Sequence, residues 1–220
     1  MTETSKVQPA YSADRTALLL VDPYNDFLAE GGKLWPLIAA VATRVSLHTR
    51  LRAIVAAARS AGISILIVPH HRAEAGDFSG WDHPTPYQLA GAEAQAFAKD
   101  TWGGQWHEDF VPQLGDGIVK EHWSSNGFAN TDLDLLLKQK SIRNVVLVGL
   151  VANTCIEGTA RAAVDLGYHT TLVTDATAAF SEEAMHAAHG INAPHFAHAI
   201  LSTQDVLDEF SKSAKPRSES

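Results

Sequence analysis

The chain alternates between short aliphatic runs and longer amphipathic stretches, and this alternation limits its possible folds more than any other feature. Most of the aliphatic runs lack a polar residue at every second position, which is typical of strands buried on both faces. We expect strands over residues 16–22, 63–69, 117–120, 144–150, 169–175 and 197–203. We expect helices over residues 37–60, 131–139, 155–166, 181–189 and 203–210. The pattern predicts an α/β fold: a doubly wound, six-stranded, mostly parallel sheet with helices on both faces, Rossmann-like in its right-handed crossovers.

The length of the chain fits one domain. A chain of 220 residues, 45% of them hydrophobic, can close a single sizeable core. We place this domain at residues 14–211, between a flexible N-terminal tail at 1–13 and a small, polar, disordered tail at 212–220. One connection, residues 70–116, is unusually long and holds three tryptophans and one helical candidate at 87–100. Such loops are commonly lids, binding loops or subunit contacts, and we expect a lid that also contributes to an interface.

Charge and hydropathy exclude several classes of partner. The formal net charge is −8 and the chain has no basic stripe, which argues against nucleic acid. No apolar stretch approaches the ~18 residues that span a bilayer, so we expect no membrane partner. The single cysteine, Cys155, cannot form an internal disulfide, and residues 1–15 contain no apolar leader. A reducing, cytoplasmic location is therefore expected.

Three residues with reactive side chains follow or end predicted strands. Asp22 ends the run 16–22, Lys120 ends the run 117–120, and Cys155 follows the run 144–150. In open α/β sheets, ligands bind outside the carboxyl ends of the strands, near the point where the strand order reverses. We therefore expect these three side chains to meet in one crevice.

The residues around the cysteine indicate what that crevice does. Thr154 and Glu157 have the spacing of a capping box, which would place Cys155 in the first turn of a helix. Free N–H groups there stabilise a thiolate and hold an oxyanion. Asp22 can accept the thiol proton, and Lys120 can add a positive charge. Taken singly, each residue also fits a plainer role as a turn, a solvated strand end or a packed thiol. Together they are a nucleophile, a base and a cation in one crevice, which three independent strand ends would not carry by accident.

Three segments resemble the isochorismatase-like cysteine hydrolases, a family that includes nicotinamidases and N-carbamoylsarcosine amidohydrolases. They are "LLLVDPYNDF", "IVKEHWSSNGF" and "GLVANTCIEGTARAAVDLGYHTTLVTDATAAF", and the resemblance runs over residues 14–210. It implies a catalytic triad of Asp22, Lys120 and Cys155. It also implies a non-proline cis peptide between Leu150 and Val151, and an oxyanion hole formed by the N–H groups of Val151 and Cys155.

The segment after the second strand departs from the nicotinamidase pattern. Nicotinamidases carry an Asp-x-His and a later His as a metal site, whereas this chain reads "VPHHRAEAGDFSGWDHPTP". We therefore expect no metal and no cofactor, with His71 and His83 at the surface or lining the pocket and His70 near the substrate. Tyr24 replaces the usual glutamine, and "ANT" replaces a Thr-Asp pair before the cysteine, which argues against nicotinamide as the substrate.

The substrate pocket should be walled by side chains that follow the strand ends or lie in the long connection. The candidates are Phe27, Trp35, His70, Trp81, Trp123, Leu150 and Asn153. An oligomer interface is the alternative role for Trp81, Trp102 and Trp106.

These residues lead to one favoured function and two alternatives. The favoured one is a cysteine-dependent hydrolase that cleaves a C–N bond of a small amide through a thioester. A primary amide, an N-carbamoyl compound, a hydrazide and a lactam all fit. The first alternative is an isochorismatase-type vinyl-ether hydrolase that uses Asp22 without the cysteine, and the second is an inactive binding protein on the same scaffold. We expect a homo-oligomer, a dimer or a tetramer, whose neighbouring subunit completes the pocket.

Overall fold

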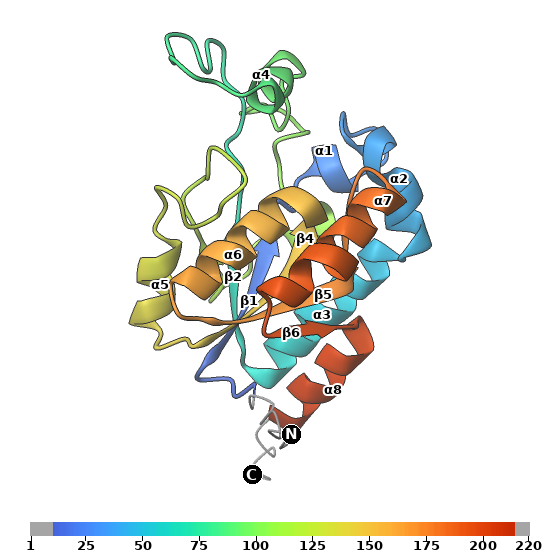
Figure 1. Cartoon of the computed structure of the whole chain (residues 1–220), viewed down its shortest axis with the longest axis vertical. Coiled ribbons are helices and arrows are strands. Elements are labelled where there is room, and N and C mark those ends of the chain that lie inside the picture. Colours follow the sequence, from blue (N-terminus) through green and yellow to red (C-terminus); the bar gives the residue numbers. More distant parts are fainter. Residues whose placement is uncertain (1–10, 214–220) are drawn as a thin grey trace.

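A computed structural model describes residues 11–213 and shows one six-stranded sheet in which every pairing is parallel (Figure 1). The strand order is β3-β2-β1-β4-β5-β6. The strands are β1 Thr16–Val21, β2 Ser64–Val68, β3 Gly117–Ile118, β4 Asn144–Leu150, β5 His169–Ala178 and β6 Ala199–Leu201. The predicted fold class is confirmed.

Helices fill the connections between these strands. The α-helices are α1 Asn25–Leu28, α2 Trp35–Arg44, α3 Leu47–Ala61, α4 Pro86–Glu93, α5 Leu133–Gln139, α6 Glu157–Asp165, α7 Glu182–Met185 and α8 Thr203–Ser213. Two π-helical turns, η2 Ala152–Ile156 and η3 His186–Asn192, precede α6 and follow α7, and short 3₁₀ turns occur at Glu108–Phe110 and Ala193–His195. Within the described residues, the structure contains no helix long and apolar enough to cross a membrane.

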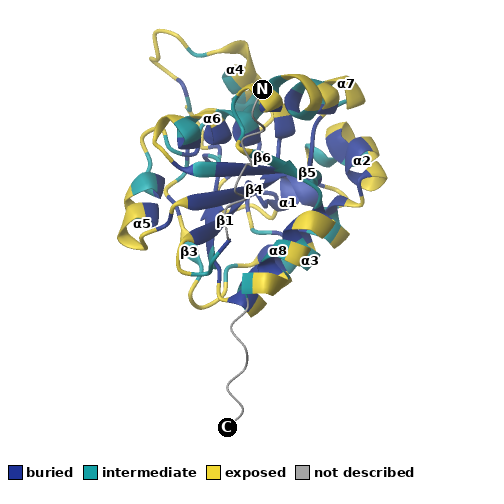
Figure 2. Ribbon diagram, turned by 60° about the horizontal axis from the view of Figure 1, so that its bottom comes forward, coloured by how far each residue is buried: buried dark blue, intermediate teal, exposed yellow. Residues whose placement is uncertain are grey.

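The sheet separates two hydrophobic cores. Alternate residues of β1 serve opposite faces, because successive side chains of a strand point to opposite sides. Leu18 and Leu20 pack in the core with α2, α3 and α8, whereas Ala17, Leu19 and Val21 pack in the core with α5 and α6. Figure 2 shows the buried strands between α6 on one side and α3 with α8 on the other. Burial on both faces explains why these strands read as unbroken apolar runs.

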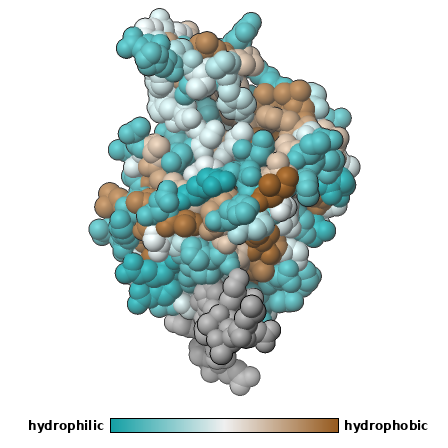
Figure 3. Space-filling view, in the orientation of Figure 1, coloured by the Kyte–Doolittle hydropathy of each residue, from teal (hydrophilic) through white to brown (hydrophobic). Residues whose placement is uncertain are grey.

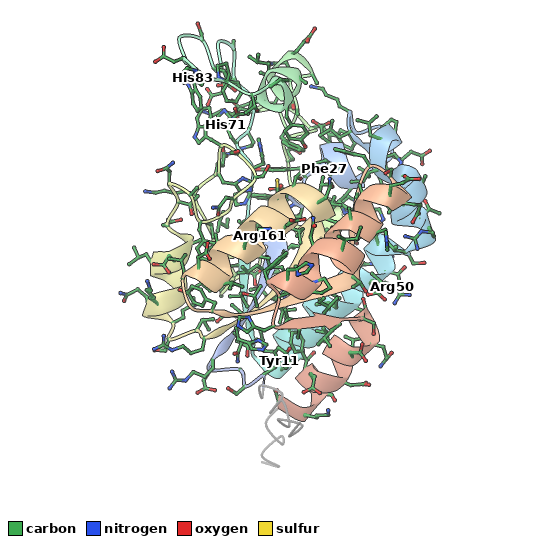
Figure 4. All side chains as sticks on the ribbon, in the orientation of Figure 1. Tyr11, Phe27, Arg50, His71, His83 and Arg161 are labelled. Carbon is green, nitrogen blue, oxygen red and sulfur yellow. The ribbon has the colours of Figure 1, made fainter. Side chains whose placement is uncertain are left out.

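Several boundaries differ from those expected. The helix expected at 37–60 is two helices, α2 and α3, because Ser46 between them has a φ of 54°. The expected N-terminal tail contains Tyr11, which is buried and packs on Phe210 of α8, and whose hydroxyl bonds Thr171 of β5 (Figure 4). Helix α8 includes residues 212–213 of the expected C-terminal tail. The remainder of the two predicted tails, 1–10 and 214–220, lies outside the described residues.

The strand order fixes where the chemistry can occur. The chain builds β2 and β3 on one side of β1 and then returns to build β4 on the other side, so the order reverses between β1 and β4. Val21 at the end of β1 pairs with Gly149 near the end of β4. Gly149 has a φ of 111°, and an added Cβ would lie 2.9 Å from the backbone nitrogen of Val21, so glycine permits this close approach. The residues that follow β1 and β4 therefore emerge side by side.

The long connection, residues 70–116, is anchored at its base and projects at its tip. Tyr24 beside α1 is stacked between Phe97 and Trp106, with ring centroids at 4.8 and 5.0 Å. Helix α4 buries none of its residues. In the space-filling view the segment around α4 stands out from the body of the molecule, and most of its surface on the face shown is pale or hydrophilic (Figure 3). This arrangement fits a lid, which stays a prediction.

Candidate active site

Asp22 directly follows β1 and points into the protein. Its φ is 54°, its N–H donates to the Val68 carbonyl oxygen at 3.1 Å, and its side chain is fully buried. Carboxylate oxygen Oδ1 lies 3.2 Å from Nε2 of His122. The second oxygen, Oδ2, is buried and makes no hydrogen bond to the other residues that the structure describes. A buried carboxylate oxygen without a donor is costly, and such a group needs a functional explanation.

Cys155 lies in the π-helical turn η2, after the end of β4. Val151 is the extended residue that precedes the turn, and the peptide bond before it, from Leu150, is cis, as the resemblance implies. The predicted capping box is wrong. Thr154 lies inside η2 and its hydroxyl is 3.5 Å from the Val151 carbonyl oxygen, so it caps no helix N-terminus. The cysteine is 4% exposed.

The thiol of Cys155 is held in its protonated form. Burial, followed by the charge of the neighbouring Asp22 carboxylate, raises the pKa of the thiol well above its ordinary value. Hydrogen bonds from the Thr154 side chain and the Val151 backbone lower the pKa but do not outweigh these causes. The expectation of a thiolate stabilised at a helix N-terminus is therefore wrong, because burial dominates over the backbone dipoles.

The structure does not bring Lys120 to this site. Lys120 is exposed, and its backbone N–H donates to Oδ1 of Asp132 at 2.8 Å. His122, two residues further on, is fully buried and faces Asp22. The pKa of His122 is raised, because the charge and the hydrogen bond of Asp22 outweigh the lowering effect of burial. The imidazole of His122 therefore lies beside Asp22, where the resemblance implies the ammonium group of a lysine.

The register of the sheet explains this outcome. Ile67 pairs with Ile118, whereas His70 pairs with His122, so the segment after β3 holds one residue more than the segment that it faces. One extra residue turns every following side chain to the other face. The one sequence signal that could have pointed to His122 is its position, two residues after the lysine in "VKEH".

Asp22, His122 and Cys155 are also the one group of potential metal donors among residues 11–213, with their donor atoms all within 4.8 Å of one another. We assign this group to acid–base and nucleophilic chemistry. Oδ1 of Asp22 and Nε2 of His122 are already at hydrogen-bond distance from each other, which suits the transfer of a proton within this group.

The candidate histidines His71 and His83, both in the long connection, lie outside that group. His71 pairs with Asp77, Nε2 to Oδ2 at 2.9 Å, and with Glu121, Nδ1 to Oε2 at 3.4 Å. His83 is exposed in the long connection (Figure 4). Neither histidine belongs to the donor group of the site.

The predicted pocket residues divide into those beside the site and those away from it. His70 is next to His122, with ring centroids 5.1 Å apart, and Leu150 is buried at the end of β4. Asn153 is exposed on η2. Phe27 is a core residue whose ring contacts the ring of Phe97 in a tilted arrangement.

The predicted tryptophans also lie in different surroundings. Trp35 packs against the core and against His48. Trp81 and Trp123 have exposed rings 5.6 Å apart, and Trp123 stacks on His71 at 3.6 Å. Trp81 and Trp123 therefore form an aromatic surface beside His71.

Tyr87 is a site residue that the sequence did not reveal. It lies in the first turn of α4, and its hydroxyl hydrogen-bonds the side chain of Thr154, next to the cysteine. Tyr87 is half exposed as a whole residue, but desolvation of its hydroxyl, and then the neighbouring Cys155 and Asp22, raises its pKa to about 12, so the hydroxyl stays neutral. Only the tertiary fold brings α4 over the cysteine, so no local sequence signal pointed to this residue.

Comparisons with known proteins identify the family and the fold of this chain. The family model described as the isochorismatase domain matches residues 16–205. The chain is 29% identical over 221 residues to the ureidoacrylate amidohydrolase RutB of Pseudomonas syringae pv. syringae (strain B728a), covering 91% of this chain and 86% of that protein. Its fold matches a cysteine hydrolase from Pseudomonas syringae pv. phaseolicola 1448A with a TM-score of 0.79 and 25% identity, over 94% of this chain and 97% of that one.

A further solved structure shares the fold. N-carbamoylsarcosine amidase from Thermoplasma acidophilum matches with a TM-score of 0.62 and 24% identity, over 86% of this chain and 96% of that one. The expected class of enzyme, a hydrolase of non-peptide C–N bonds, is the class of these named relatives. The match over residues 16–205 shows that this chain belongs to the isochorismatase domain family.

Proposed function

We propose that this protein hydrolyses a C–N bond of a small amide through a covalent thioester, with Cys155 as nucleophile and Asp22 as acid and base. One observation carries the proposal. A buried, protonated thiol lies beside a buried carboxylate with one unpartnered oxygen, at the carboxyl ends of adjacent strands. A protonated thiol needs a base as it attacks, and the unpartnered oxygen of Asp22 supplies one.

The first half-reaction forms the acyl-enzyme. Sγ of Cys155 attacks the amide carbonyl carbon while the thiol proton passes to Oδ2 of Asp22. The carbonyl oxygen becomes an oxyanion, which the N–H groups of Val151 and Cys155 stabilise. The C–N bond then breaks, Asp22 returns the proton to the departing nitrogen, and ammonia or an amine leaves.

The second half-reaction restores the enzyme. Water attacks the thioester carbonyl, and Asp22 accepts one of its protons. The C–S bond breaks, the sulfur takes the proton back from Asp22, and the carboxylic or carbamic acid leaves. Each proton that Asp22 accepts is returned, so the cycle ends with the starting thiol and carboxylate.

Among the four amide classes we favour N-carbamoyl compounds. The named relatives act on ureidoacrylate and N-carbamoylsarcosine, both of which carry a carbamoyl nitrogen group. The neutral hydroxyl of Tyr87 lies beside the cysteine and can donate to a carbamoyl oxygen.

The test is an activity panel of N-carbamoyl compounds, primary amides, hydrazides and lactams with the purified protein, followed by Cys155→Ala and Cys155→Ser. We expect both variants to lose turnover, and intact-mass measurement to trap an acyl group on the wild-type protein only. Cys155→Ala that keeps near wild-type turnover would refute the thioester. Turnover of a vinyl ether by that variant would favour the alternative in which Asp22 acts alone.

We further propose that the protein works as a homo-oligomer in the cytoplasm. The exposed rings of Trp81, Trp102 and Trp123 support a subunit contact near the long connection. The free thiol of Cys155 fits a reducing compartment. Light scattering at assay concentration and cell fractionation test these two statements, and an active monomer would contradict the first.

A further inference from the structure

We propose that the imidazolium of His122 is the positively charged group of this active site: its Nε2–H binds Oδ1 of Asp22 and leaves Oδ2 to take the Cys155 proton. The inference rests on the proposed function. It makes His122 a positioning residue that acts through Asp22, in the role that the family resemblance implies for a lysine.

The hydrogen-bond partners of His122 determine where its protons are. Nδ1 lies 2.5 Å from the carbonyl oxygen of Ser124, which can only accept, so Nδ1 carries a hydrogen. A neutral ring would then turn the lone pair of Nε2 toward Oδ1 of Asp22, which is 3.2 Å away. Two acceptors face each other at this distance only when a proton lies between them. The pair therefore shares one proton, and the ionic form places it on His122.

The ring cannot turn away from Asp22. The His122 N–H donates to the Pro69 carbonyl oxygen at 2.9 Å, and the His122 carbonyl oxygen accepts from the His71 N–H at 2.8 Å. The ring is fully buried and packs edge-on against His70. Backbone and side chain are thus both fixed, as a positioning role requires.

The charges around His122 favour its cationic form. Asp22 faces it from the end of β1, Cys155 from η2 and His70 from the segment after β2. Burial is the main cause that lowers the pKa of His70, which keeps that ring neutral. Glu121, the preceding residue, adds negative charge. With a neutral thiol and a neutral His70, the Asp22 carboxylate is the closest charge to the ring.

An imidazolium in place of an ammonium has a measurable consequence. Ordinary pKa values are about 6.5 for histidine and about 10.4 for lysine. The charge of Asp22 helps to raise the pKa of His122, so the cation persists above about pH 6.5 and is lost as the pH rises through the raised pKa. Activity of this protein should therefore decline on the alkaline side as His122 loses its proton.

The experiment compares His122→Gln, His122→Lys and a matched control, Lys120→Ala, in the full chain. Glutamine keeps a donor for Asp22 but no charge, whereas lysine restores a charge. Lys120 is exposed, so its variant controls for the loss of a nearby cation. Two readouts are used: the pH profile of kcat/KM on the substrate found by the panel, and the rate at which iodoacetamide alkylates Cys155, which needs no substrate.

We expect His122→Gln to lower kcat/KM by about 100-fold or more and to slow alkylation at neutral pH. We expect His122→Lys to stay within about tenfold of wild type and to move the alkaline decline upward by about one pH unit or more. Lys120→Ala should match wild type in both readouts. Thermal melting of each variant establishes that it is folded.

A His122→Gln variant with the kcat/KM and alkaline decline of wild type would overturn the inference, and so would a folded His122→Lys variant as inactive as His122→Gln. Failure of the proposed function looks different, because Cys155→Ala would stay active or no amide would be cleaved. Alkylation then still decides the role of His122: slowing in His122→Gln supports it, and an unchanged rate refutes it.

Discussion

Gly158 should be required for both stability and catalysis, because it lets the segment that carries His122 lie against α6. An added Cβ at Gly158 would lie 2.9 Å from the Ser125 carbonyl carbon and closer still to its oxygen, whereas ordinary contact begins at 3.4 Å. That oxygen is the limiting contact, so the carbonyl must move by more than about 1 Å in Gly158→Ala. Ser125 follows Ser124, whose carbonyl oxygen orients the His122 ring. The displacement thus reaches the active site.

The size of the effect follows from two opposing changes. Overpacking costs about 1–3 kcal/mol, and replacing a helical glycine by alanine returns up to about 1 kcal/mol. The net loss of about 1–2 kcal/mol should lower the melting temperature by about 2–8 °C. A 1 Å misplacement costs about 100-fold in rate, so a movement of this size should lower kcat/KM by about 100-fold.

Thermal melting and steady-state kinetics of Gly158→Ala measure both quantities. Gly91→Ala is the matched control, because Gly91 is also helical and an added Cβ there meets nothing within 4 Å. The control should melt at or slightly above the wild-type temperature. Wild-type melting and wild-type kcat/KM in Gly158→Ala would refute the link between this glycine and the His122 segment.

Two further predictions concern the long connection. Tyr87→Phe removes the hydroxyl that bonds Thr154, and should raise KM by about tenfold with little change in kcat or melting temperature; an unchanged KM with a reduced kcat would contradict this. Protonated His71 should stabilise the long connection at acidic pH. Burial lowers the pKa of His71, but its hydrogen bonds to Glu121 and Asp77 raise that pKa above the ordinary value overall. This stabilisation is therefore complete below about pH 6.5 and is lost as pH rises through the raised pKa. The protection factors of the amides of residues 71–78, which correct for the intrinsic rise of exchange with pH, should be lower at pH 8.5 than at pH 6, and His71→Gln should abolish the difference; equal protection factors in wild type would count against it.

Much of the fold could be predicted from the sequence because its causes are local. Strands buried on both faces must be apolar throughout, so β1 and β4 are recognisable as runs. Asp22 and Cys155 follow those runs, and in a parallel sheet the carboxyl ends of neighbouring strands share one edge. The sequence by itself therefore determined the architecture, the edge at which the site lies, and two of its reactive side chains.

The third side chain was decided by tertiary structure. Lys120 and His122 differ by two positions, and which of them points inward depends on one extra residue in the pairing with the segment around His70. A register shift of this kind leaves no mark on local composition, because it is set by how the chain after β3 fits against its neighbour. The family pattern led to the lysine, and the fold selected the histidine.

The protonation state of the Cys155 thiol was also decided by the tertiary structure. The sequence around Cys155 indicated a helix start and an ionised thiol, whereas its pKa is raised by burial and by a carboxylate more than a hundred residues away in the chain. Tyr87 likewise reaches the site only because the long connection folds back over η2. Backbone pattern and strand order are encoded in near neighbours along the chain, whereas the desolvation and electrostatics of a site depend on residues that only folding brings together.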